Sequence, residues 1–254
     1  MKGWTALQLA GSRPGGDPFA EAEGVKAKAL IPVAGDPMIA RPIRALLASP
    51  RINRVRVLAQ DGELLAPALP DDPRLSIERS GATIASTIEA IIADPATAWP
   101  LLVTTADHAL LDEAMIDEFC TRAAGADVAI GLVERRALMA RLPQTKRTWI
   151  GFRGGAYSGA NLFALGSPKA AAAVQLWREV EQDRKKGWKL LAALGLPGLL
   201  GLARLRTLDQ VLEAMGRRLG STIRAIELSN PLAAVDVDKP ADLTLVRAII
   251  RGRA

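Results

Sequence analysis

An acidic side chain follows a strongly apolar segment in the first half of this 254-residue chain. Asp107 comes directly after the run Leu101–Thr105 and one alanine, and this run is typical of a strand buried on both faces. In open α/β sheets, ligands bind at the edge formed by the carboxyl ends of the strands. A carboxylate at that edge can hold Mg²⁺ that bridges nucleotide phosphates. We therefore predict that Asp107 is a metal ligand, and a helix or turn cap is the alternative role.

A loop of small residues follows the strand-like segment 4–10. Gly11 has no side chain and Ser12 has a small one, so backbone N–H groups there can approach a phosphate closely. Arg13 can bind phosphate oxygens through two parallel hydrogen bonds. The segment lacks the P-loop signature and the dinucleotide-binding fingerprint. These residues are compatible with a phosphate-binding loop, but by themselves they favour an ordinary strand-to-helix turn, and the next motif is what favours the phosphate-binding role.

A second motif follows at 26–39 and reads Lys-Ala-Lys-Ala-Leu-Ile-Pro-Val-Ala-Gly-Asp-Pro-Met-Ile. Leu-Ala-Gly with a nearby arginine, followed by Lys-Ala-Leu-x-Pro-Val-x-Gly-x-Pro-Met-Ile, resembles the nucleotidyltransferase superfamily. That superfamily includes the molybdenum cofactor guanylyl- and cytidylyltransferases and the sugar-phosphate nucleotidylyltransferases. Further matches extend the resemblance over nearly the whole chain.

The resemblance implies roles for individual positions. The first loop would wrap the triphosphate, Lys28 would lie against the phosphates, and a glycine and a serine further along would contact the base. The nucleotide-binding residues implied in this way are Leu9, Ala10, Gly11, Ser12, Arg13, Lys28, Gly81 and Ser86. Lys26 would replace Lys28 in a shifted register, and a capped helix start is the alternative for segment 79–86. We expect Arg13, Lys28 and Asp107 to act in catalysis.

A third match lies near the end of the chain, where segment 236–243 resembles the family pattern Asp-x-Asp-x-Pro-x-Asp-Leu. The second position of that pattern supplies a metal ligand, so the resemblance implies that Asp238 holds Mg²⁺ together with Asp107. Asp236 is the second candidate, and we do not expect both Asp236 and Asp238 to reach one ion. The alternative role for Asp238 is to cap the final helix, with Pro240 in its first turn.

Segment 157–163 resembles the acceptor-side loop of the family, which implies that Asn161 binds the acceptor by a hydrogen bond. His108, the only histidine, is a candidate general base. The reaction that the resemblance implies does not need one, because an acceptor phosphate is already anionic and can attack the α-phosphorus itself.

Strand-like and helical segments alternate along the first half, which predicts βαβ units and a largely parallel sheet. With the resemblance, the expected fold is a Rossmann-like three-layer αβα sandwich with a mostly parallel, mixed central sheet, similar to the GT-A fold. The predicted strands are 4–10, 54–59, 101–105, 127–133, 161–165 and 222–228. The predicted helices are 37–49, 83–93, 112–124, 168–183, 207–219 and 240–251, with Asp112 as a cap and a capping box at Thr207. We expect one domain over 1–254, with a nucleotide-binding half at 1–135 and an acceptor-binding half at 136–254.

The formal net charge is +6, which is compatible with anionic partners. Aromatic residues make up only 4% and do not alternate with basic ones, so the sequence does not predict nucleic acid as a partner. Cys120 is the single cysteine, which excludes an internal disulfide, and it is expected to be a buried thiol in a reducing cytoplasm. No secretory signal is recognisable at the start of the sequence.

The longest apolar stretch is the glycine-broken segment 190–203, with basic residues on both sides. It is shorter than the roughly 20 residues that a spanning helix needs. Core packing or a homodimer contact is the plain interpretation, and peripheral contact with the inner membrane face is the alternative.

Together these features predict a cytoplasmic, Mg²⁺-dependent nucleotidyltransferase. It would transfer a nucleoside monophosphate from a nucleoside triphosphate, with CTP or GTP favoured, to a small phosphorylated acceptor and release pyrophosphate. The alternatives are a nucleotide-sugar glycosyltransferase and a non-catalytic nucleotide-binding regulatory protein.

Overall fold

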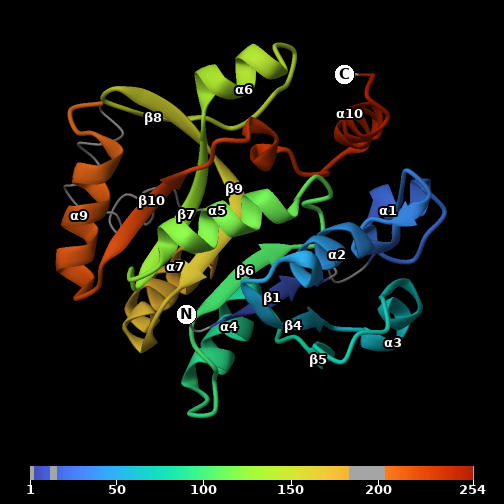
Figure 1. Ribbon diagram of the computed structural model, residues 1–254, viewed down its shortest axis with the longest axis horizontal. Helices are drawn as coiled ribbons and strands as arrows, with labels where there is room; N and C mark the ends of the chain where they lie inside the picture. The colour runs from blue at the N-terminus through green and yellow to red at the C-terminus, as the bar shows by residue number, and fades with distance from the viewer. Residues whose placement is uncertain (1–2, 12–15, 183–203, 254) are drawn as a thin grey trace.

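The computed structural model describes residues 3–11, 16–182 and 204–253 (Figure 1). Two predicted phosphate-loop residues, Ser12 and Arg13, lie outside the described residues. The apolar segment 190–203, with its predicted dimer or membrane contact, lies outside them as well. Within the described ranges, no helix combines the length and the apolar character that crossing a membrane requires.

A mixed eight-stranded sheet forms the middle of the molecule (Figure 1). Its strands are β1 (Trp4–Leu9), β4 (Ile52–Ala59), β5 (Leu75–Arg79), β6 (Leu101–Thr105), β7 (Val128–Glu134), β8 (Ile150–Phe152), β9 (Gly155–Leu165) and β10 (Ile223–Glu227). The order across the sheet is β10-β7-β9-β6-β1-β4-β5, and β8 pairs with β9 beside this path. β9 runs antiparallel to β6, β7 and β8, and the remaining neighbours are parallel. The prediction of a mostly parallel, mixed sheet is therefore confirmed.

Helices cover both faces of this sheet, which gives the predicted three layers. The α-helices are α1 (Pro18–Ala22), α2 (Ala40–Ala48), α3 (Gly62–Leu65), α4 (Ile84–Ala93), α5 (Glu113–Ala123), α6 (Arg135–Arg141), α7 (Ala171–Gln182), α9 (Leu208–Leu219) and α10 (Pro240–Ile250). Successive residues of β6 point to opposite faces. Leu102 belongs to the apolar cluster that includes α2 and α5, whereas Val103 belongs to the cluster that includes α4 and α7.

Short 3-10 turns and a small hairpin complete the described structure. The turns are η1 (Lys28–Leu30), η2 (Ala66–Ala68), η3 (Pro168–Ala170) and η4 (Pro231–Ala234). The hairpin pairs β2 (Pro32–Val33) with β3 (Asp36–Pro37). Its turn residues Ala34 and Gly35 both have positive φ, at 54° and 99°, as tight hairpin turns require. The predicted helix start near Pro37 is therefore wrong, because this residue lies in β3 and α2 begins at Ala40.

The predicted caps are confirmed, whereas some strands escaped prediction. Asp112 accepts a hydrogen bond from the backbone of Met115 at 2.8 Å, and Thr207 forms a capping box with Gln210. β5 was not predicted, because it lies at the sheet edge and all its residues are half-buried or exposed, which weakens the apolar pattern. β8 and α6 were not predicted either, and β9 begins six residues before the predicted strand 161–165.

The end of β9 offers a direct test of this packing. A Cβ atom at Gly166 would lie 2.0 Å from the carbonyl oxygen of Ala126, so backbone must move to admit one. Gly166→Ala should lower the free energy of unfolding by about 3 kcal/mol. Gly159→Ala, within β9, is the matched control, because no described atom beyond its chain neighbours lies within 4 Å of its Cβ position. Equal urea midpoints for the two variants would contradict the expectation.

Candidate active site

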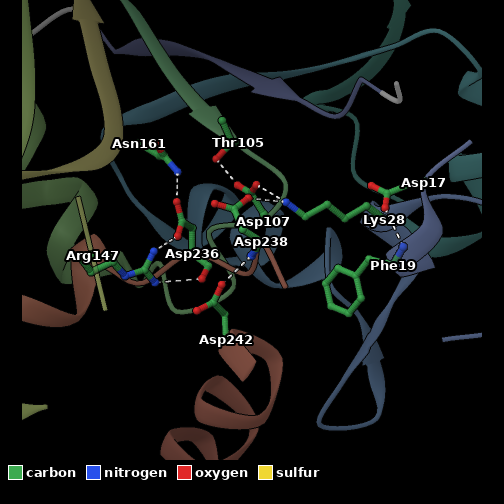
Figure 2. Close-up of polar contacts among 10 residues, drawn as sticks. All are labelled: Asp17, Phe19, Lys28, Thr105, Asp107, Arg147, Asn161, Asp236, Asp238 and Asp242. Atoms are coloured by element: carbon green, nitrogen blue, oxygen red, sulfur yellow. Dashed lines mark hydrogen bonds and ion pairs between the residues drawn. The ribbon is translucent and has the colours of Figure 1, made fainter. Parts of the chain in front are cut away.

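Charged side chains from distant parts of the sequence converge at one edge of the sheet (Figure 2). β1 and β6 are parallel, and Leu9 lies opposite Thr105, so both strands end at this edge. Ligands of open α/β sheets bind at such an edge. The three residues that meet there are Lys28, Asp107 and Asp238, each of which the sequence singled out.

Asp107 is fixed immediately after β6 by hydrogen bonds to both of its carboxylate oxygens. Thr105 Oγ1 donates to Oδ1 at 2.5 Å, and Lys28 Nζ donates to Oδ2 at 2.8 Å. The side chain is 21% exposed, so it faces the site without being open to bulk water. The helix that follows, α5, is capped by Asp112. Asp107 therefore does not cap that helix, which was its alternative role.

The segment between η4 and α10 brings two further carboxylates to the same place. Val235 and Val237 are fully buried, and the Val237 N–H donates to the Asp107 carbonyl at 3.1 Å. Because alternate residues of an extended segment share a face, Asp236 and Asp238 both lie on the opposite side, toward the site. Asp238 is 63% exposed, and its Oδ1 accepts from Lys28 Nζ at 2.8 Å.

Asp238 does not cap the final helix, which was its alternative role. The N-cap position of α10 is Lys239, and no side chain caps the helix there. In this region the Asp238 backbone is the donor: its N–H donates to the carboxylate of Asp242 at 3.2 Å. Asp242 therefore holds the backbone of the segment, while the Asp238 side chain is directed to Lys28 (Figure 2).

Lys28 supplies the positive charge between the two carboxylates. It lies in η1 between the buried Ala27 and Ala29, which anchor the backbone, whereas Lys26 is exposed. Burial lowers the pKa of Lys28, but the carboxylates of Asp107 and Asp238 outweigh burial and raise it above the usual 10.5. The ammonium group is therefore charged at neutral pH.

Two arginines attach the second motif to the rest of the site. Arg41 Nε donates to the Ala109 carbonyl at 2.9 Å, which ties α2 to the loop after β6. Arg247 Nη2 donates to the Pro32 carbonyl at 2.6 Å, which ties α10 to the hairpin. The elements that carry the lysine and the two aspartates are thus bound to one another.

Asp236 has different partners, which come from the second half of the chain. Its Oδ2 accepts from Asn161 Nδ2 at 3.0 Å, and its Oδ1 accepts from Arg147 Nη1. Arg147 Nη2 also donates to the Asp236 carbonyl at 3.0 Å. Burial raises the pKa of Asp236, the Arg147 charge opposes that rise, and the charges of Asp238 and Asp107 add to it.

A β-bulge aims Asn161 at this position. Ile130 of β7 pairs with Phe163 and Leu132 pairs with Gly159, so one β7 residue faces three residues of β9. Asn161 lies within the bulge and has a φ of 48°, a left-handed conformation that asparagine adopts more readily than most residues. Bulges beside functional sites commonly redirect a side chain in this way.

Comparison with known proteins identifies the family of this chain. Residues 11–225 match the family model of the MobA-like NTP transferase domain. The chain belongs to this family of nucleotidyltransferases. No curated protein matches it significantly.

Several solved structures share the fold of this transferase. A hypothetical transferase from Thermus thermophilus aligns with a TM-score of 0.80 and 29% identity, over 95% of this chain and 99% of that one. The 4-diphosphocytidyl-2C-methyl-D-erythritol synthase of Anaerococcus prevotii aligns with a TM-score of 0.58 and 8% identity, over 98% and 96%. A CMP:2-keto-3-deoxy-manno-octonic acid synthetase complexed with CTP aligns with a TM-score of 0.57 and 15% identity, over 99% and 100%.

The other predicted nucleotide-binding residues of the transferase differ in exposure and in hydrogen bonding. The side chains of Leu9 and Ala10 are buried, and the Ala10 N–H already donates to the Leu58 carbonyl, whereas Gly11 is exposed at the end of β1. Ser86 completes the capping box of α4, and a Cβ at Gly81 would come within 3.0 Å of its hydroxyl. The capped helix start is therefore present, and base contacts at Gly81 and Ser86 stay predictions.

Two site residues of the transferase were absent from the sequence-based set. Thr105 is part of the predicted strand, and its hydrogen bond to Asp107 could have been anticipated from their i, i+2 spacing. Arg147 lies in a segment without regular hydrophobic periodicity, so nothing in the sequence indicates that its side chain is only 10% exposed and paired with Asp236.

His108 and Cys120 are both buried in the transferase. Burial lowers the pKa of His108 to about 4, so the ring is neutral at physiological pH, and its exposed fraction of 0% keeps it from serving as a base for a bound substrate. Burial raises the pKa of Cys120 to about 12, as an unreactive thiol requires. The prediction of a buried thiol is confirmed.

The buried histidine makes the transferase sensitive to acid. The unfolded chain takes up a proton at His108 near pH 6.5 and the folded chain only near pH 4, so unfolding is favoured as the pH falls between these values. The free energy of unfolding in EDTA should fall by up to about 3 kcal/mol across this window. His108→Gln should remove most of that slope. An unchanged slope in urea titrations of the variant would contradict the expectation.

Proposed function

We propose that this transferase moves a nucleoside monophosphate from CTP or GTP to a small phosphorylated acceptor, with Mg²⁺ as cofactor and pyrophosphate as product. The observation that carries the proposal is the position of Lys28 Nζ, 2.8 Å from a carboxylate oxygen of Asp107 and 2.8 Å from one of Asp238. The ammonium group of Lys28 therefore lies between two aspartates, at the edge where open α/β sheets bind their ligands.

The donors at this edge fit Mg²⁺. Asp107 and Asp238 would hold the ion, since hard oxygen ligands are the ones that Mg²⁺ prefers. In the described part of the chain, no group of three or more acidic, histidine or cysteine side chains is placed so that it could hold a metal ion. That agrees with Mg²⁺ chemistry, because this ion is usually held by one or two carboxylates together with substrate phosphates and water. The bound ion would supply charge neutralisation at the phosphates.

The reaction needs positioning and positive charge rather than proton transfer. An acceptor phosphate oxygen attacks the α-phosphorus of the triphosphate, and the bond from the α-phosphorus to the bridging oxygen of the β-phosphate breaks. Pyrophosphate leaves with that bond pair, and no proton must be removed from the acceptor. Lys28, charged at neutral pH, stabilises the negative charge around the reacting phosphates. The burial of His108 agrees with a mechanism that has no general base.

The two ends of the site suggest where each substrate binds. The loop after β1, with Gly11 followed by Ser12 and Arg13, is proposed to bind the triphosphate. Asn161 is proposed to contact the acceptor, because the bulge in β9 turns it toward the carboxylate edge. Both remote structural neighbours carry cytidine nucleotides in their names, which makes CTP the first triphosphate to test.

Ligand-induced stabilisation tests the nucleotide assignment. Melting temperatures would be measured with CTP, GTP, UTP and ATP, each with and without Mg²⁺. A ligand at 100 times its dissociation constant adds about 2.7 kcal/mol, which corresponds to about 5–10 °C in a chain of this size. We expect a shift of this order for CTP or GTP only when Mg²⁺ is present. The absence of a shift with every triphosphate would contradict the proposal.

The same assay tests the metal ligand. Asp107→Asn keeps the shape and the Thr105 hydrogen bond but removes the charge, so the Mg²⁺-dependent part of the nucleotide shift should disappear. Pyrophosphate release with the acceptor, once identified, should fall by at least about 100-fold. Asp71→Asn is the matched control, because Asp71 is exposed and is not a hydrogen-bond or ion-pair partner of Lys28 or Asp107. A variant at Asp107 that retains the full Mg²⁺ effect would overturn the assignment.

A further inference from the structure

Three carboxylates come close together at the active-site edge, but their hydrogen-bond partners differ (Figure 2). Asp107 and Asp238 share the ammonium group of Lys28. Asp236, from the same face of the same segment as Asp238, is bound to Arg147 and Asn161 instead. The charges of Asp238 and Asp107 contribute to the raised pKa of Asp236, after burial, so the three groups lie within electrostatic range of one another.

The partners of Asp236 occupy both of its carboxylate oxygens. Arg147 donates to Oδ1 and Asn161 donates to Oδ2. The second guanidinium nitrogen of Arg147 donates to the backbone carbonyl of Asp236, so one arginine holds both the side chain and the main chain of this residue. A planar guanidinium that makes two such bonds fixes orientation as well as charge.

This arrangement limits how many carboxylates can reach a metal. With Asp236 directed to Arg147, two aspartates remain for the ion, which matches the absence of a three-ligand cluster among residues 3–11, 16–182 and 204–253. The affinity of an oxygen-ligand site rises with the number of its charged ligands. A third free carboxylate would allow the protein to bind the cation tightly without its nucleotide.

We propose that Arg147 is a positioning residue that withholds Asp236 from the metal, so that the divalent cation binds well only together with the triphosphate. This inference rests on the proposed Mg²⁺ site at Asp107 and Asp238. Its functional consequence is that the enzyme acquires its metal with the substrate, and that the acceptor side keeps an Asp236–Asn161 pair of fixed geometry.

Mn²⁺ binding without nucleotide tests the inference, with the electron paramagnetic resonance signal of free Mn²⁺ as the readout. The wild-type chain should bind Mn²⁺ weakly, and Arg147→Ala should bind it at least about tenfold more tightly, because Asp236 becomes free to act as a ligand. The double variant Arg147→Ala, Asp236→Asn should return to the weak binding of the wild type. A Mn²⁺ affinity in Arg147→Ala that is no tighter than that of the wild type would overturn the inference. Tightening that persists in the double variant would likewise overturn the inference.

Two further variants keep the test decisive if Arg147→Ala does not fold. Arg147→Gln retains most of the side-chain volume and should also tighten Mn²⁺ binding, though less strongly. Asp236→Asn alone should weaken Mn²⁺ binding much less than Asp107→Asn does, with and without CTP, because Asp236 acts on the ion only through its charge and is not a ligand in the wild type. A loss of Mn²⁺ affinity in Asp236→Asn as large as that in Asp107→Asn would overturn the inference.

Failure of the inference can be told apart from failure of the proposed function. If the wild type binds Mn²⁺ in the presence of CTP and Asp107→Asn does not, the metal site stands, and the Arg147 variants decide the inference alone. If the wild type binds no Mn²⁺ with CTP or GTP, the proposed metal site itself is wrong.

Discussion

The contact on which this site depends is the ammonium group of Lys28 between the carboxylates of Asp107 and Asp238, which are 79 and 210 positions away in the sequence. Two carboxylates so close together repel unless a positive charge lies between them. The same attraction raises the pKa of Lys28. The segments around this contact, from η1 to the start of α10, keep the three charged groups close enough to one another for the contact to form.

The direction of one strand joins the two halves of the chain around that contact. β9 is antiparallel to both β6 and β7, whereas most of the sheet is parallel. Its bulge lies opposite β7 and turns Asn161 toward Asp236. β9 therefore contributes Asn161 to the site through a local irregularity in a regular sheet, which is where a side chain can be redirected without disturbing the core.

The structural neighbours indicate which features of the molecule depend on particular residues. The fold is retained at 8% and 15% identity in two nucleotide-handling proteins, so the sheet order and the helical layers tolerate almost complete replacement of side chains. Function on a shared fold resides in the side chains at its ligand edge. At that edge of this transferase, Arg147 and Asn161 contact Asp236, and Lys28 contacts Asp107 and Asp238, so the two groups divide three carboxylates between them.

The sequence by itself determined the layered α/β architecture and most strands and helices, and it singled out Lys28, Asp107 and Asp238 as candidate site residues. Apolar periodicity and capping residues are local properties, and short motifs report chemistry that is also local. Tertiary structure alone decided that Lys28 lies between the two aspartates and that Asp236 turns to Arg147. It also decided the bulge at Asn161 and the edge strands β5 and β8, whose weak apolar patterns predict little. These features depend on which distant segments pack together, and a charge pair across the sheet edge leaves no periodic trace in the sequence of either partner.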